Sequence, residues 1–211
     1  MKNKCTIFFL LGSMLSLTIC IGQTPLSEKE QRAFKEKVQE TAKNTSSITS
    51  NFEQVKQLEM LSEPIVSKGM LAFQAPDNIL WQYTTPKTYK VIFKEELLLV
   101  DNNGKKDEIK LSSNKLFRSF NELIVNSIKG AMFDEDEFEI SYFNTAEGYL
   151  VKFIPRDKKM KRFVSVFELT FTQEKGEVIQ VKLIEPNTDY TLIRFSKRKT
   201  NVKIPAETFT L

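Results

Sequence analysis

The sequence contains no histidine, and this absence excludes several kinds of chemistry. Without an imidazole there is no Ser-His-Asp or Cys-His catalysis, no histidine-ligated metal and no usual general base near neutral pH. Glycine-rich nucleotide-binding motifs are also absent, and the acidic stretch 134–137 lacks the glycine and ligand spacing of a calcium loop. The formal net charge of +4 is too small to indicate a nucleic-acid partner. We therefore expect a protein that is not an enzyme, with no catalytic residue, no metal and no cofactor.

Cysteine is nearly as scarce, since only Cys5 and Cys20 are present and both lie near the N-terminus. Two lysines, at positions 2 and 4, precede the apolar run 6–21, which ends in small residues. This is the pattern of a secretory signal peptide, and the run is shorter than the ~20 residues that favour an uncleaved membrane anchor. We expect residues 1–22 to be cleaved, and residues 23–211 to form a single exported domain that its core alone stabilises.

Local patterns predict two helices and a series of strands. Ser27 and Glu30 form a capping box at the start of a helix that ends near Asn44. From residue 47 onwards, apolar and polar residues alternate over short segments that turn-forming residues separate. A second, strongly apolar helix is predicted between Ser113 and Gly130.

These elements predict a mainly β fold with α. We expect a strongly curled antiparallel sheet of about 10 or 11 strands, an unclosed half-barrel, covered by the central apolar helix and the N-terminal helix. The sequence also contains 17 Phe, 5 Tyr and one Trp, and such rings fill wide spaces. The pattern alone leaves two possibilities open: a curled sheet filled by its own side chains, and one that encloses a ligand cavity.

A spacing of glycine, prolines and tryptophan carries a family resemblance. Gly69, Pro76, Trp81 and Pro86, with an upstream "SNFEQ" and a closing "NVKIPAETF", resemble the LolA-type periplasmic carriers of outer-membrane lipoproteins. The similarity extends over residues 23–211, and the family pattern leads us to expect a last strand near residue 209. The sequence differs from the family pattern at two positions, where Ala75 replaces an arginine and Ile79 replaces a bulky aromatic residue.

The resemblance implies a function in which no covalent bond is formed or broken. A LolA-type protein is a periplasmic chaperone that shields lipoprotein acyl chains in an apolar cavity and moves them from the inner to the outer membrane. The implied partners are acylated lipoproteins, an inner-membrane lipoprotein-releasing ABC transporter and an outer-membrane acceptor of unknown type, and we expect a monomer. Two alternatives remain open: a carrier of another envelope lipid or acylated metabolite, and a non-enzymatic module that senses a lipid or a protein.

The candidate lipid-binding residues come from the strands and from the central helix. Ile79, Trp81 and Tyr83 alternate along one strand and so share one face. The helix residues would pack on the strand residues when no lipid is bound. The complete set is Phe52, Leu71, Phe73, Ile79, Trp81, Tyr83 and Phe93 from the strands, and Leu116, Phe120, Leu123 and Ile124 from the helix.

Overall fold

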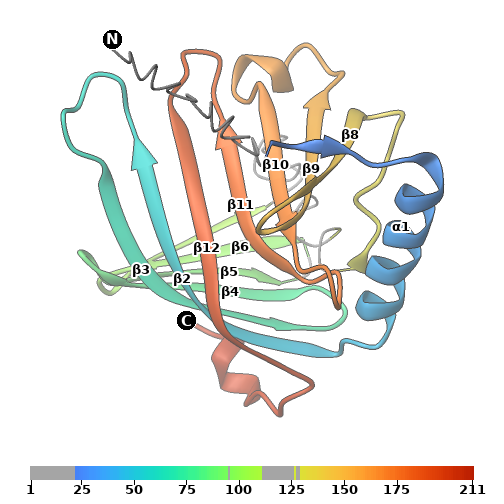
Figure 1. Cartoon of the computed structure of the whole chain (residues 1–211). Helices are drawn as coiled ribbons and strands as arrows, with labels where there is room; N and C mark the ends of the chain where they lie inside the picture. The colour runs from blue at the N-terminus through green and yellow to red at the C-terminus, as the bar shows by residue number, and fades with distance from the viewer. Residues whose placement is uncertain (1–21, 95, 111–125, 127–128) are drawn as a thin grey trace, which may run out of the picture.

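The computed structural model of the chain describes residues 22–94, 96–110, 126 and 129–211. These residues form one antiparallel sheet of 12 strands with the N-terminal helix α1 beside it (Figure 1). The predicted mainly β fold and its N-terminal helix are confirmed. The strands are β1 Thr24–Pro25, β2 Ser47–Gln57, β3 Ile65–Gln74, β4 Asn78–Thr85, β5 Tyr89–Lys94, β6 Leu97–Asn102, β7 Lys105–Lys110, β8 Phe138–Thr145, β9 Gly148–Pro155, β10 Val166–Phe171, β11 Val178–Ile184 and β12 Tyr190–Thr200. The helices are α1 Glu28–Lys43 and the 3-10 helices η2 Met160–Arg162 and η3 Ala206–Phe209.

The strand order shows how distant parts of the chain meet. The order is β1-β8-β9-β10-β11-β12-β2-β3-β4-β5-β6-β7, and every neighbouring pair is antiparallel. Most neighbours are consecutive in the chain and joined by short turns. The exceptions are β1 beside β8 and the long pairing of β12 with β2, in which Phe195 lies opposite Phe52. The β12–β2 pairing joins two meanders into a single sheet.

Three expectations about the sheet are wrong. The sheet is unclosed, as expected, but it is not strongly curled, because α1 and the C-terminal segment cover apolar parts of its faces and the sheet does not have to wrap around itself to bury them. It has 12 strands rather than 10 or 11, since the two-residue β1 pairs with β8 through long-range contacts that no local pattern indicates. The expected last strand near Phe209 is the 3-10 helix η3, which begins after Pro205, a residue that cannot donate to a strand ladder. Most of the predicted central helix lies outside the described residues, which include only Asn126, Lys129 and Gly130 of that range.

Helix α1 forms as its sequence predicts and packs on one face of the sheet. The Ser27 side chain accepts a hydrogen bond from the Glu30 backbone, while the Glu30 carboxylate accepts one from the Ser27 backbone at 2.8 Å. Asn44 ends the helix. Phe34 and Val38 are its buried residues. Among the described residues, no helix has both the length and the hydrophobicity that crossing a membrane requires.

Apolar side chains cover both faces of the sheet in three clusters. We call the face under α1 the inner face. One half of it carries the helix-covered cluster, and the other half carries the open-half cluster; on the opposite, outer face, Ile204 and Phe209 of the C-terminal segment cover Ala72, Leu80 and Ile92. The helix-covered cluster contains Leu26, Phe34, Val38, Met132, Phe138, Tyr142, Val151, Phe153, Val164, Phe167, Leu169 and Phe171. The open-half cluster contains Ile48, Phe52, Leu71, Phe73, Ile79, Trp81, Phe93, Leu98 and Ile193.

The loops at one end of the strands also lie together. Because neighbouring strands are antiparallel, β2, β9 and β11 all end on the same side, where loops 58–64, 156–165 and 185–189 follow them. We call this side the hairpin end of the sheet. It lies at the top of Figure 1, where the three loops project beyond the sheet.

Candidate functional site

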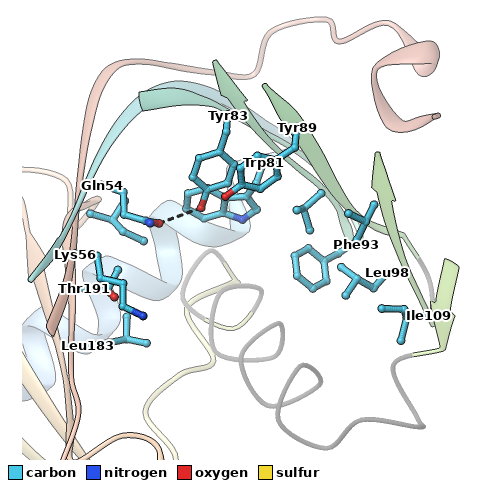
Figure 2. Close-up of a pocket in the computed structure, with 13 residues that line it drawn as sticks. Gln54, Lys56, Trp81, Tyr83, Tyr89, Phe93, Leu98, Ile109, Leu183 and Thr191 are labelled. Atoms are coloured by element: carbon cyan, nitrogen blue, oxygen red, sulfur yellow. Dashed lines mark hydrogen bonds between the residues drawn. The ribbon is translucent and has the colours of Figure 1, made fainter. Parts of the chain in front are cut away.

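A pocket of about 490 Å³ lies on the inner face, over the open half of the sheet (Figure 2). Its volume falls within the range of sites for small organic ligands. Strands from both sides of the β12–β2 junction contribute to it, so the pocket exists only once the two meanders have paired. The lining residues are Gln54, Lys56, Trp81, Tyr83, Tyr89, Val91, Phe93, Leu98, Val100, Ile109, Leu183, Thr191 and Ile193.

Aromatic rings hold Trp81 in place at the wall of the pocket. Its ring centroid is 4.9 Å from that of Phe52 in an edge-on contact and 6.0 Å from that of Phe195. Phe52 also contacts Tyr83 edge-on at 5.0 Å. These rings come from β2, β4 and β12, so the contacts fix three strands relative to one another.

Gly69 explains why Phe52 can occupy this position. Gly69 pairs with Phe52 on one side and with Tyr83 on the other. A Cβ atom at Gly69 would collide with the Gln82 carbonyl oxygen and would lie 2.7 Å from Cζ of Phe52. The glycine of the sequence motif therefore leaves space for the ring that supports Trp81.

The polar lining residues lie toward the hairpin end. Tyr83 donates a hydrogen bond from its hydroxyl to Oε1 of Gln54 at 3.0 Å, and its ring stacks on Tyr89 at 4.2 Å (Figure 2). Burial raises the pKa of both tyrosines above the ordinary value, with the neighbouring Tyr89 adding to the shift at Tyr83. Both hydroxyls are therefore neutral at physiological pH. Lys56 also belongs to this end of the pocket, and its ammonium group lies 3.9 Å from the Glu185 carboxylate.

One polar atom of a lining residue has no hydrogen-bond partner among the described residues. The indole Nε1 of Trp81 is buried, and within the described structure it makes no hydrogen bond. An unpaired buried donor costs about 1–3 kcal/mol. Such a cost is unusual in a folded core, and an oxygen atom that reached this donor would be stabilising.

Six of the seven predicted strand residues belong to the open-half cluster, and the seventh, Tyr83, packs against it. Trp81, Tyr83 and Phe93 line the pocket. Four others, Phe52, Leu71, Phe73 and Ile79, belong to the same cluster but not to the lining, and each is almost fully buried. The four predicted helix residues, Leu116, Phe120, Leu123 and Ile124, lie outside the described residues.

Sequence reasoning missed several lining residues. Val91 lies two positions before Phe93 in β5 and Val100 two positions after Leu98 in β6, so strand alternation could have identified them. Leu183 and Ile193 are different, because β11 and β12 reach the pocket only through the pairing of β12 with β2. No local signal indicates that pairing.

Comparison with known proteins provides a family and a fold. Residues 43–211 match the family model of the outer membrane lipoprotein carrier protein LolA. No curated protein sequence matches the chain.

Among solved structures, an uncharacterised conserved protein from Thermus thermophilus is similar with a TM-score of 0.53 and 5% identity, covering 85% of this chain and 92% of that one. A chain of the MucA/MucB complex of Pseudomonas aeruginosa is similar with a TM-score of 0.51 and 8% identity, covering 86% of this chain and 61% of that one. A LolA superfamily protein from Nitrosomonas europaea gives 0.46 and 11%, covering 85% and 97%.

Proposed function

Given that the chain belongs to the LolA family of outer membrane lipoprotein carrier proteins, we propose that it carries lipoprotein acyl chains in the pocket of the inner face. Carriers of this family are periplasmic and non-catalytic. The exported chain would receive acylated lipoproteins from an ABC transporter of the inner membrane and deliver them to an acceptor at the outer membrane. Acyl chains need such a carrier because they cannot cross an aqueous compartment exposed.

The observation that supports this proposal is the apolar character of the pocket wall. Eight of its lining residues are apolar, and they come from six strands: Trp81, Val91, Phe93, Leu98, Val100, Ile109, Leu183 and Ile193. Burial of each methylene contributes about 0.8 kcal/mol, so a chain of about 16 carbons gains on the order of 12 kcal/mol before binding costs. Apolar burial alone is therefore enough to hold the cargo, and no bond has to form or break.

The distribution of polar and apolar lining residues suggests how an acyl chain would be oriented in the pocket. The hydroxyls of Tyr83 and Tyr89 and the ammonium group of Lys56 lie toward the hairpin end, while Leu98 and Ile109 lie farther from it. The acyl chain would extend over Leu98 and Ile109 and leave its ester group near the polar end. The unpartnered Nε1–H of Trp81 would then donate a hydrogen bond to an ester carbonyl.

The experiment that tests the function is purification of the protein from its native envelope, with mass spectrometry of the molecules that remain bound. We expect diacyl or triacyl lipoproteins. A different envelope lipid would favour a carrier with another cargo on the same fold. A stable protein complex without lipid would favour a sensing module. Depletion of the protein should also slow the arrival of lipoproteins at the outer membrane, and normal arrival would contradict lipoprotein carriage.

Substitution of Trp81 tests the proposed orientation of the acyl chain, in which its ester group lies near the Trp81 indole. Trp81→Phe removes the indole donor and keeps an aromatic ring, so affinity for an alkyl ester should fall about tenfold. An alkane of the same length has no carbonyl, and its affinity should fall much less. Isothermal titration of both ligands against both proteins measures the difference. An equal loss for ester and alkane would show that the substitution acts through packing alone.

A further inference from the structure

The hairpin end of the sheet exposes an unusual concentration of apolar side chains. Among the described residues, Met70 is the one large exposed hydrophobic side chain that does not lie there. Met60 is 86% exposed, and Phe163 is 51% exposed. The large apolar side chains exposed at the hairpin end are Met60, Leu61, Ile65, Val66 and Phe163.

The β2–β3 hairpin is uncovered on both of its faces. Ile65 and Val66 are consecutive in β3, so their side chains point to opposite faces of the sheet. Both are nevertheless exposed. The hairpin rises at the upper left of Figure 1, and residues 65–67 of β3 extend beyond the pairing with β4, which begins at Lys68. A strand that faces water on both sides with apolar side chains is expected to bury them against something else.

The β9–β10 loop, at the same end of the sheet, adds a concentration of positive charge. It contains five exposed cationic residues and one acidic residue, Asp157. The Asp157 carboxylate accepts hydrogen bonds from the backbone of Lys159 and Met160, so it serves the fold of the loop. Phe163 follows directly after the cationic residues. These are Arg156, Lys158, Lys159, Lys161 and Arg162.

Acidic groups at the hairpin end are mostly engaged within the protein. Asp189 is buried, accepts a hydrogen bond from the Glu59 backbone at 2.7 Å and accepts another from the Asn187 side chain. Glu185 pairs with Lys56. Glu59 and Glu63 remain exposed beside Met60 in the β2–β3 loop. The positive charge is thus concentrated in the β9–β10 loop, and the strongest apolar exposure in the β2–β3 loop.

We propose that the hairpin end docks on the surface of an anionic lipid membrane. Met60 and Leu61 would enter the boundary between headgroups and acyl chains, and the basic residues around Phe163 would bind the anionic headgroups. The two loops are separated by four strand spacings of about 4.8 Å each, so both can contact one flat surface.

This surface also adjoins the polar end of the pocket. Lys56, Leu183 and Thr191 line the pocket and lie within two residues of the ends of their strands at the hairpin end. Docking would bring the pocket next to the membrane, so an acyl chain could enter or leave it with little exposure to water. Membrane binding by these loops does not require that the proposed cargo be correct, and the two can be tested separately.

Vesicle flotation tests the proposal with the protein recovered from the periplasm. We expect it to float with vesicles made of equal amounts of phosphatidylcholine and phosphatidylglycerol, and to float poorly with phosphatidylcholine alone. Lys158→Gln with Lys159→Gln should lower the partition coefficient about fivefold for each charge removed. Met60→Ser with Leu61→Ser should lower it about tenfold or more, because the apolar contact is lost.

A matched control carries the same loss of charge at the opposite end of the sheet. The control variant is Lys43→Gln with Lys175→Gln. Lys43 is the last residue of α1, and Lys175 lies in the β10–β11 turn. The two segments contact each other, since the Thr41 hydroxyl donates a hydrogen bond to the Lys175 carbonyl oxygen at 2.5 Å. This variant should float like the wild type, and all variants should keep the wild-type unfolding midpoint. The proposal is overturned if the wild type does not bind mixed vesicles, or if the control loses as much binding as the hairpin-end variants. Unchanged ligand affinity in the hairpin-end variants would separate docking from carriage.

Discussion

The two halves of the inner face are built from strands with the same alternation of side chains, but one half is buried core and the other carries the pocket. Under α1, Phe153, Phe171 and Val151 are completely buried, and Phe34 of the helix contacts four aromatic rings. Across the open half, Val91 and Val100 occupy equivalent alternating positions but remain partly exposed in the pocket wall. The difference teaches that a strand's own residues do not decide whether its face becomes core or pocket. Within the part of the chain that the structure describes, the half that packs against α1 is core, and the other half carries the pocket.

The largest test of this comparison is Phe34→Ala. Phe34 is 2% exposed, and its removal leaves a cavity under α1, so unfolding should become easier by about 3–5 kcal/mol. Urea unfolding followed by circular dichroism measures the loss. Glu36→Ala, on the exposed side of the same helix, should change the free energy of unfolding by less than about 0.5 kcal/mol. The folded fraction should keep its affinity for lipid, and a loss of affinity would show that the two halves are coupled.

Gly69→Ala tests the support beneath the pocket. The new Cβ atom would meet the Gln82 backbone and the Phe52 ring. We expect a loss of about 1–3 kcal/mol in stability, as for overpacked cores, together with weaker lipid binding because Trp81 loses its support. Ser67→Ala in the same strand serves as the control. If Gly69→Ala were as stable as the wild type, the glycine of the motif would need another explanation.

Val100→Phe should separate binding from stability. The added ring would occupy pocket volume, so lipid affinity should fall at least about tenfold, while stability changes by less than about 1 kcal/mol because the side chain faces a cavity. Glu108→Phe adds the same ring on the outer face and should leave affinity unchanged. Competition with a fluorescent fatty acid measures both variants. Full affinity in Val100→Phe would place the cargo elsewhere.

The smallest expected effect concerns the start of α1. Hydrogen bonds from the side chain and backbone of Ser27 lower the pKa of Glu30 below its ordinary value. Because the folded pKa is the lower one, this contribution is present above about pH 4.3 and is lost as the pH falls through the folded value. The unfolding midpoints of wild type and Ser27→Ala should therefore converge on acidification. A constant difference from about pH 6 to about pH 3 would contradict a role for the Glu30 carboxylate.

Short-range signals predicted much of this molecule. The capping box at Ser27 and Glu30 is formed as expected, and the alternation of Ile79, Trp81 and Tyr83 correctly placed these residues on one face. Both signals operate within one turn or one strand, where propensity and periodicity are strongest. The same logic extended along β5 and β6 would have found Val91 and Val100. The resemblance based on Gly69 and Trp81 agrees with the family match.

Long-range pairing could not be predicted in this way. The strand count failed because β1 pairs with β8 across more than a hundred residues, and η3 replaced a strand because Pro205 precedes it. Leu183 and Ile193 were missed as pocket residues because, as with β1, their position depends on pairing between distant segments of the chain. Their place depends on β12 lying beside β2, which is a property of the whole sheet.

What the sequence by itself determined is therefore local: the helix cap, the alternating faces, the turns and the absence of catalytic histidine or cysteine in the expected exported chain. The tertiary structure decided where those faces meet. It placed α1 over β8–β11, formed a pocket from residues of β2, β4–β7, β11 and β12, and gathered Met60 and Phe163 at one end of the sheet. The physical reason is that side-chain alternation specifies which face a residue takes, while burial of that face depends on partners far away in the chain.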